Sequence, residues 1–335
     1  MIKIGIIGYG YWGPNLVRNF SGIESCAIKK VADRRKERID ALVKNFPSVQ
    51  GVMTDTEIIN DPDIDAVVVA TPVFTHYDIA FRALKEGKHV LIEKPMTSTS
   101  DQALKLIELA NQKQKVLMVD HTYLYTGAVR KIKELIDSNE IGSINYFDSS
   151  RINLGLFQPD INVLWDLSPH DISILNFIHK EKPYSIHATG TCHTGNGIEN
   201  IAYLTINYQS GFIAHFNCSW SSPVKIRMML IGGDKKMIVY NDLEPTEKVK
   251  VYDTGYTYTT DEEQYNIRVD YRSGDIYLPK VSIKEALSFM ADDFVSAISK
   301  KTVPVSDYNS GLSVIKILEA SNESLKNRGK EVIIK

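Results

Sequence analysis

Cysteine is scarce in this chain, and the few cysteines indicate neither a disulfide framework nor a metal site. The 335 residues include only Cys26, Cys192 and Cys218, which are odd in number, far apart and outside any metal-ligand spacing. We therefore expect three reduced thiols, no bound metal and a cytoplasmic protein.

Long apolar runs and an excess of one charge are also missing. No run approaches the roughly 20 apolar residues that span a bilayer, and the first residues enter a strand with no charged leader. Lys and Arg number 39 against 41 Asp and Glu, and the net charge of −2 gives no support to a nucleic-acid or anionic-membrane role. The sequence thus predicts a soluble globular protein with neither nucleic acid nor membrane as a partner.

Up to about residue 120 the chain alternates apolar strands with amphipathic helices. This alternation predicts an α/β domain with a doubly wound parallel sheet, right-handed crossovers and helices on both faces. We place this first domain at residues 1–121. The expected strands are 2–7, 27–32, 65–70, 88–92 and 116–119, and the expected helices are 14–20, 34–45, 75–86 and 100–113.

From residue 122 successive strands follow one another with few helices, which predicts a mostly antiparallel open sheet. We assign residues 122–335 to a second α/β domain, with a cleft between the domains and a last helix able to pack back on the first. Residues 242–280 are left unassigned. The expected strands are 144–152, 185–193, 200–208, 211–220, 225–232 and 236–241, and helices are expected at 126–138, from Ser168, at 283–299 and at 308–327.

The most specific motif follows the first strand. Gly8 permits a tight turn, Gly10 lets the backbone approach a pyrophosphate, and Gly13 lets the next helix pack closely. That helix begins near Pro14, and its free N–H groups would face the phosphates. Asp33 ends the second strand, at the distance where a carboxylate accepts hydrogen bonds from ribose hydroxyls. Together these features predict a dinucleotide-binding Rossmann domain.

The residue that ends the second strand also bears on the choice of cofactor. Asp33 favours NAD over NADP, because a carboxylate there repels a 2′-phosphate. Arg34 and Arg35 follow directly and would soften that preference, so NADP is the less favoured alternative. Tyr11 and Trp12, inside the glycine turn, and Arg34 are counted among the expected cofactor-binding residues.

Polar residues follow the next expected strand, at the edge where ligands of such sheets bind. Thr71 and Pro72 end that strand, and Thr75 is expected to cap the following helix. We expect Thr71, Pro72 and His76 to lie beside the cofactor, although His76 alone also fits an ordinary histidine of a first helical turn.

Glu93, Lys94 and Pro95 follow the strand at 88–92. Lysine is a compact cation with three donors, so Lys94 is able to hydrogen-bond a reacting hydroxyl or carbonyl oxygen. Pro95 restricts Lys94 to an extended backbone. The position at a strand end favours a catalytic and cofactor-binding role for Glu93 and Lys94 over a surface ion pair.

Residues 165–171 form the densest polar cluster of the second domain. We expect Ser168 to cap a helix that Pro169 starts. Asp166 and His170, four residues apart, would then converge on one cleft, where histidine is a natural proton acceptor from a substrate hydroxyl. A plain capping cluster is the alternative.

Gly8-x-Gly10-x-x-Gly13, Glu93-Lys94-Pro95 and Asp166-x-x-x-His170, in this order and spacing, resemble the Gfo/Idh/MocA oxidoreductases over essentially the whole chain. The resemblance implies a Rossmann domain, a C-terminal open-sheet domain that often forms homodimers or homotetramers, and a tightly held NAD(H) or NADP(H). It also implies that Lys94 contacts the reacting oxygen, that His170 is the acid/base and that Asp166 orients the substrate.

Three further segments resemble the branch of this family that oxidises nucleotide sugars at C3. They are His121–Tyr125, Arg151–Gly155 and Ser219–Arg227. This resemblance implies UDP-N-acetylglucosamine or its uronate as the substrate. The residues expected to line the substrate pocket are Tyr123, Arg151, Asn153, Trp165, Asp166 and His170.

Some of these assignments have equally plain alternatives. Tyr123 and Trp165 fit interdomain packing as well as a pocket, and Lys225 and Arg227 fit a solvated strand edge as well as a diphosphate site.

The predicted reaction is hydride transfer between a secondary alcohol carbon and nicotinamide, with His170 as base and Lys94 stabilising charge on oxygen. An NADP-dependent reductase of 3-ketosugar nucleotides and a dehydrogenase of inositol or free sugars are alternatives. A non-catalytic dinucleotide-binding regulator is a further one, but it would not need the lysine and histidine together.

Overall fold

The computed structural model describes residues 1–258 and 269–334 and divides into two compact units. The first unit comprises Met1–Thr126 and Lys284–Lys316, and the second comprises Gly127–Ile283 and Ile317–Lys335. The segment 284–316, placed in the second domain on sequence grounds, thus lies in the first unit. No helix among the described residues is long and apolar enough to cross a membrane.

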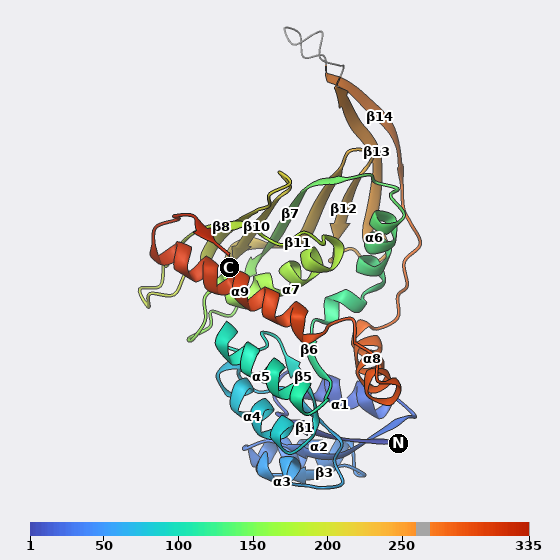
Figure 1. Ribbon diagram of the computed structural model, residues 1–335, viewed down its shortest axis with the longest axis vertical. Helices are drawn as coiled ribbons and strands as arrows, with labels where there is room; N and C mark the ends of the chain where they lie inside the picture. The colour runs from blue at the N-terminus through green and yellow to red at the C-terminus, as the bar shows by residue number, and fades with distance from the viewer. Residues whose placement is uncertain (259–268, 335) are drawn as a thin grey trace. The chain divides into compact units, whose positions relative to one another are not determined.

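The first unit is built on a six-stranded parallel sheet in the order β3-β2-β1-β4-β5-β6 (Figure 1). The order reverses between β1 and β4, and ligands of such sheets bind at that reversal, beyond the carboxyl ends of the strands. This confirms the predicted Rossmann sheet, but β3 is too short to give a sequence pattern and was not predicted. The strands are β1 Ile2–Ile7, β2 Cys26–Ala32, β3 Gln50–Val52, β4 Ala66–Val69, β5 His89–Glu93 and β6 Leu117–Asp120.

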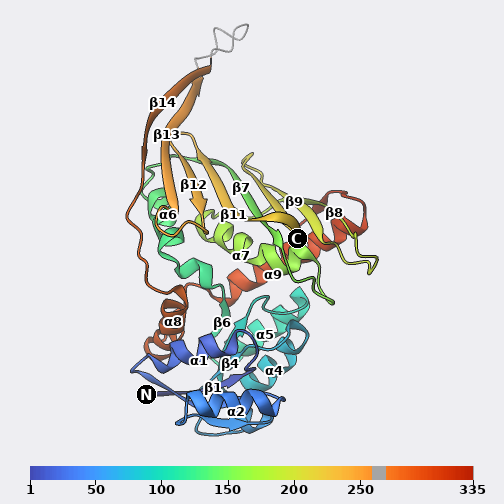
Figure 2. The ribbon, with the colours of Figure 1, turned by 180° about the vertical axis from the view of Figure 1, so that it is seen from behind.

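Helices cover both faces of this sheet (Figures 1 and 2). α4 packs on α5, and α1 packs on α8, where the rings of Phe20 and Phe294 meet edge to face with centroids 6.3 Å apart. That contact explains why 284–316 joins the first unit, because Phe294 is fully buried there. The helices are α1 Gly13–Ser21, α2 Lys36–Asn45, α3 Thr56–Ile59, α4 Val73–Lys85, α5 Ser100–Gln112, the 3₁₀ turn η1 Thr122–Tyr125, and α8 Ala286–Lys300.

The second unit holds a nine-stranded sheet in the order β14-β13-β12-β11-β7-β10-β9-β8-β15. Its neighbouring strands are antiparallel except β7 and β10, which confirms the predicted mostly antiparallel sheet. Within 242–280, β13 and β14 form a long ribbon (Figure 2), and residues 259–268 lie outside the described residues. The strands are β7 Ile144–Leu154, β8 Ser185–Thr191, β9 Ile201–Asn207, β10 Ile213–Ser219, β11 Ser221–Gly233, β12 Met237–Asn241, β13 Val249–Tyr258, β14 Val269–Tyr277 and β15 Val332–Ile333.

One face of the nine-stranded sheet is covered by helix α7, which packs on β7, β9 and β10 and on helix α6. The opposite face leaves apolar side chains open, with Tyr203 and Ile213 each more than two-fifths exposed. The helices are α6 Gly127–Asp137, α7 Val163–Ile178 and α9 Tyr308–Lys326, of which α9 begins in the first unit and ends in the second.

Helix α7 begins five residues earlier than the sequence suggested. Asn162 caps it, accepting a 3.2 Å hydrogen bond from the backbone N–H of Trp165, and Pro169 lies inside the helix. Ser168 does not cap the helix, because its hydroxyl donates to the carbonyl of Leu164 at 2.7 Å. His170 therefore projects from the middle of a helix rather than from its first turn.

The expected cap of α4 is also wrong. The helix begins at Val73 directly after Pro72, and the N-cap residue makes no side-chain hydrogen bond. The Thr75 hydroxyl lies within the first turn, 2.7 Å from the carbonyl of Pro72 and 2.6 Å from the hydroxyl of Thr71. Thr75 thus ties the turn after β4 together instead of capping the helix.

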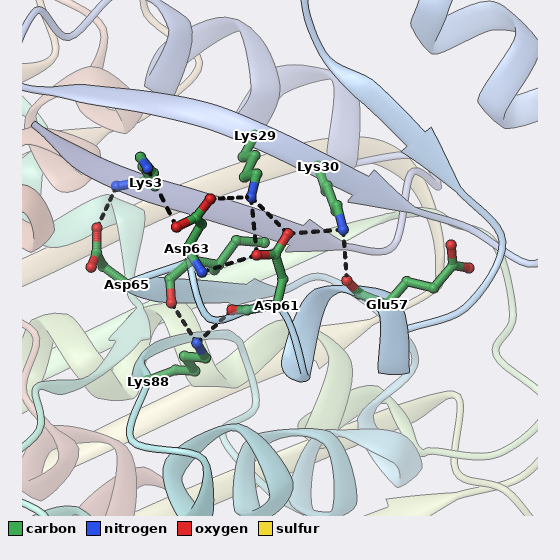
Figure 3. A network of polar contacts seen from close by, with 9 residues as sticks. Lys3, Lys29, Lys30, Glu57, Asp61, Asp63, Asp65 and Lys88 are labelled. Carbon is green, nitrogen blue, oxygen red and sulfur yellow. Dashed lines mark hydrogen bonds and ion pairs between the residues drawn. The ribbon is translucent and has the colours of Figure 1, made fainter.

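A network of charged side chains lies around the segment that precedes β4 in the first unit (Figure 3). Asp61 Oδ2 lies 2.8 Å from Lys30 Nζ and 2.9 Å from Lys29 Nζ. Lys88 Nζ donates to the carbonyls of Asp61 and Ile64, each at 2.7 Å. Hydrogen bonds from Lys30 and Lys29 hold the pKa of Asp61 well below its ordinary value.

Replacing Asp61 by asparagine should therefore cost stability in a pH-dependent way. We expect the free energy of unfolding to fall by about 1 kcal/mol at pH 7, the range of partly exposed ion pairs. Because the folded pKa lies below the unfolded value of about 3.9, this stabilisation is present above that pH and is lost as the pH falls through the folded pKa. Urea unfolding at neutral pH and below pH 4 measures both parts, with exposed Asp40→Asn as the charge-matched control. An equal loss at both pH values would contradict the assignment.

Candidate functional site

Two glycines of the turn after β1 are required by the fold itself. Gly8 has a φ of +102°, and a Cβ there would lie 2.3 Å from the carbonyl oxygen of Ala70. A Cβ on Gly13 would lie 2.5 Å from the carbonyl oxygen of Gly8, because α1 starts close against the strand. Both positions therefore exclude a side chain for reasons within the protein.

Gly10 differs, because the protein around it has room for a side chain. The nearest atom to a Cβ built there is Arg35 Nη2, at 3.8 Å. No contact with the described residues requires glycine at position 10. A glycine here, beside the N-terminus of α1, fits a turn that a pyrophosphate approaches closely. The residues present thus fit a dinucleotide.

Gly10→Ala should separate binding from folding. We expect an unchanged thermal midpoint and a Kd for NAD(H) raised by about tenfold or more, equivalent to about 1.4 kcal/mol. Fluorescence titration gives the Kd and scanning calorimetry the midpoint. Gly22→Ala, just after α1, is the matched control, because a Cβ there has ordinary contacts beginning at 3.5 Å. Wild-type affinity in Gly10→Ala would argue against a pyrophosphate at this turn.

Asp33 is held at the end of β2 by two neighbours. Its Oδ2 accepts the backbone N–H of Tyr9 at 2.9 Å, and its Oδ1 accepts the backbone N–H and Nε of Arg35 at 3.0 and 3.1 Å. Burial alone raises the pKa of Asp33, but these hydrogen bonds outweigh it and bring the pKa below its ordinary value. Asp33 is therefore an ionised acceptor beside the glycine turn, while Arg34 and Tyr11 are exposed.

His76 lies between the turns that follow β4 and β5. Its Nδ1 is 2.9 Å from the carbonyl oxygen of Pro95, and its Nε2 is 2.7 Å from that of Thr71. The ring is fully buried, and burial lowers its pKa. Both nitrogens thus face carbonyl oxygens, and the single N–H of the neutral ring donates to one of them, whereas Pro72 precedes α4 at the same edge of the sheet.

Glu93 and Asp120 are register partners at the ends of β5 and β6. Glu93 is partly exposed as a residue, but its Oε1 atom is buried, and its Oε2 accepts the backbone N–H of Lys94 at 3.0 Å. Burial, reinforced by the Asp120 carboxyl group, raises the pKa of Glu93 well above its ordinary value. Burial and the neighbouring Asp120 carboxyl group therefore both favour the protonated form of Glu93 beside Lys94.

Asp120 also connects this pair to the glycine turn. It accepts hydrogen bonds from the hydroxyl of Thr122 and from Trp12 Nε1, the latter at 3.4 Å. Sequence analysis did not include Asp120 in the site, although it ends a buried strand as Glu93 does, and that signal was sufficient to find it. Lys94 leaves the sheet next to this pair, and the Lys94–Pro95 peptide bond is cis.

In the second unit, Asp166 and His170 lie one turn apart on α7 and so share a face of the helix. Asp166 Oδ2 accepts a 3.0 Å hydrogen bond from the indole N–H of Trp220, which is itself buried. Trp165, next to Asp166, is also buried, and its indole N–H has no acceptor among the described residues. This end of α7 thus combines a fixed carboxylate, an imidazole and a buried donor.

Arg151, expected to bind substrate, is engaged inside the second unit. Its Nε lies 2.9 and 3.0 Å from the two carboxylate oxygens of Asp171, and the Ser149 hydroxyl donates to the same carboxylate at 2.6 Å. Arg151 and Asp171 are both buried. Asn153 follows on the same face of β7, because side chains alternate along a strand.

The remaining candidates are spread over other elements. Tyr123 lies half-buried in η1 of the first unit, Lys225 is exposed on β11, and Arg227 Nη1 lies 3.4 Å from Asp242 Oδ2. Across the described ranges, no group of His, Cys, Asp and Glu side chains is arranged to hold a metal ion.

Comparison with known families settles the family. Residues 2–121 match the model described as "Oxidoreductase family, NAD-binding Rossmann fold", and residues 129–239 match the GFO/IDH/MocA C-terminal domain. The chain belongs to the Gfo/Idh/MocA oxidoreductase family. Its first unit is accordingly a nicotinamide-dinucleotide Rossmann domain, as predicted.

The individual relatives share less than a third of their residues with this chain in the matched regions. The chain is 28% identical to UDP-N-acetylglucosamine 3-dehydrogenase of Acidithiobacillus ferrooxidans over 65% of this chain and 67% of that protein. It is 31% identical to the NADP⁺-dependent scyllo-inositol 2-dehydrogenase IolW of Bacillus subtilis over 49% and 44%. The solved structure of the Acidithiobacillus ferrooxidans enzyme has a TM-score of 0.81, with 21% identity over 97% of this chain and 98% of that one, a likeness in fold. The chain spans about half the length of the first curated relatives it matches.

Proposed function

We propose that this protein is an NAD-dependent dehydrogenase of a secondary alcohol on a sugar ring. The observation that carries the proposal is that the glycine turn, Asp33 and Lys94 all follow strands of one parallel sheet and so share its carboxyl edge. Bound at that edge, a nicotinamide supplies a hydride acceptor. A cation at the end of β5 is then suited to hold the alcohol oxygen.

We assign three residues to the chemistry. His170 takes the hydroxyl proton, Lys94 hydrogen-bonds the oxygen as negative charge develops on it, and Asp166 orients the sugar. The hydrogen bond from Trp220 supports the role of Asp166, because it holds the carboxylate in a fixed orientation on α7. Tyr123, Asn153 and Trp165 are proposed to line the pocket, and the unpaired indole N–H of Trp165 favours a polar ligand.

The proposed substrate is a UDP-linked N-acetylated sugar or its uronate, oxidised at C3. Similarity to the UDP-N-acetylglucosamine 3-dehydrogenase supports this class. Similarity to the scyllo-inositol 2-dehydrogenase supports the second candidate, a dehydrogenase of inositols. The reverse reaction, reduction of the 3-ketosugar nucleotide, uses the same residues.

NAD is the proposed cofactor, because the ionised Asp33 carboxylate repels a 2′-phosphate. Arg35, which would otherwise attract that phosphate, is engaged with Asp33 in the first unit. Titrating the purified protein with NADH and with NADPH tests this choice, and tighter binding of NADPH would reverse it.

The substrate class is tested by turnover. The protein is incubated with NAD⁺ and, separately, UDP-N-acetylglucosamine, its uronate, inositols and free sugars, and NADH is followed by absorbance. We expect the largest kcat/KM for a UDP sugar. The largest value for an inositol would support the second candidate, and bound NADH without turnover of any substrate would contradict an enzyme of this class.

We also propose that the chain forms a homodimer or homotetramer through the open face of the nine-stranded sheet. Exposed Tyr203 and Ile213 on neighbouring strands support this, because apolar side chains there lack cover within one chain. Sedimentation analysis of the wild type and of Ile213→Lys tests it, and a monomeric wild type would contradict it.

A further inference from the structure

The first unit contains three histidines, and two of them have protein partners. His76 contacts the carbonyl oxygens of Thr71 and Pro95, and His89 Nδ1 accepts the backbone N–H of Val116 at 2.9 Å. Polar contacts within the first unit therefore account for the positions of both rings.

His121 has no such partner. It is 1% exposed, and neither ring nitrogen makes a hydrogen bond to any residue that the structure describes. Burying an imidazole without partners costs free energy, so a side chain retained in this state indicates a ligand that completes its hydrogen bonds.

The position of His121 indicates which ligand. It follows β6 directly, at the carboxyl edge of the sheet where Glu93 and Lys94 follow β5. Burial, assisted by the nearby positive charge of Lys94, lowers the pKa of His121 to about 3. The ring is therefore neutral and offers one donor and one acceptor, which suits a neutral group rather than an anion.

We propose that His121 binds a hydroxyl or amide group of the ligand held beside Lys94. Two groups have this chemistry: the carboxamide of the nicotinamide and a hydroxyl of the substrate. The inference rests on the proposed function and extends it by one ligand-contacting residue.

The test measures stability and binding separately. In His121→Leu we expect the unfolding midpoint without ligand to rise, because a buried unsatisfied group is removed, while binding weakens by about tenfold or more. A residue with a merely structural role would lower the midpoint. His121→Asn and His121→Gln place an amide near the positions of Nδ1 and Nε2, and one of them should recover part of the binding. His89→Leu is the matched control, expected to lower the midpoint and leave binding unchanged.

Two binding measurements distinguish the sources of the group. A raised Kd for NADH identifies the carboxamide, and a raised substrate KM at saturating NAD⁺ identifies the substrate hydroxyl. Unchanged Kd and KM in His121→Leu, or a lowered midpoint, would overturn the inference while wild-type turnover left the proposed function intact. A wild type that binds no dinucleotide would overturn both, and it is measured first.

Discussion

Replacing Lys94 by alanine should lower kcat by about 10²–10⁴-fold, the usual contribution of a positioned acid–base or hydrogen-bonding group. The physical reason is that the lysine ammonium stabilises the alcohol oxygen more strongly as negative charge develops on it. Binding of NADH should be retained, since Gly10 and Asp33 lie elsewhere at the edge of the sheet. Steady-state kinetics with the best sugar substrate, together with a cofactor titration, measure both effects.

The control for this variant is Lys85→Ala, which removes an exposed lysine near the end of α4 and should leave kcat unchanged. A double variant with His170→Ala tests whether Lys94 and His170 serve one step, because residues that act as a unit cost little more together than the worse one alone. Normal cofactor binding with full turnover in Lys94→Ala would refute its assignment.

Replacing Arg151 by alanine should lower the free energy of unfolding by about 3–5 kcal/mol, the usual cost of removing one partner of a buried ion pair. The Asp171 carboxylate would remain buried. Of the side-chain hydrogen bonds described above, it would keep the one from the Ser149 hydroxyl and lose those from Arg151. Urea unfolding followed by circular dichroism measures the loss.

An apolar replacement of both partners distinguishes a structural pair from a substrate contact. Arg151→Met combined with Asp171→Leu should recover most of the lost stability, because no buried charge is left unpaired. An Arg151→Ala protein with wild-type stability and a raised substrate KM would instead support the substrate contact expected from the sequence.

The Rossmann strands and the glycine turn could be predicted because each is encoded in a short local pattern. β1, β4, β5 and β6 are nearly continuous apolar runs, as strands buried on both faces are. Gly8 and Gly13 are required by close contacts with Ala70, just after β4, and with the turn after β1. The spacing of these glycines alone is therefore enough to predict the turn.

The start of α7 could not be read correctly from local preference. Proline favours a first helical turn, which placed the start near Ser168, but Asn162 provides a cap further upstream and the helix continues through Pro169. The same limit applies to Arg151, whose partner Asp171 comes from a helix that packs on its strand. Which polar side chains pair inside a domain depends on packing, and a single sequence contains no direct record of it.

The hydrogen bond from Trp12 to Asp120 has a practical consequence. The chain has three tryptophans, and Trp12 is the one that falls within the first unit, whereas Trp165 and Trp220 fall within the second. Its indole joins the glycine turn to the end of β6, so we expect a dinucleotide bound at that turn to change the emission of Trp12. Intrinsic tryptophan emission should then report on the occupancy of the first unit without a label.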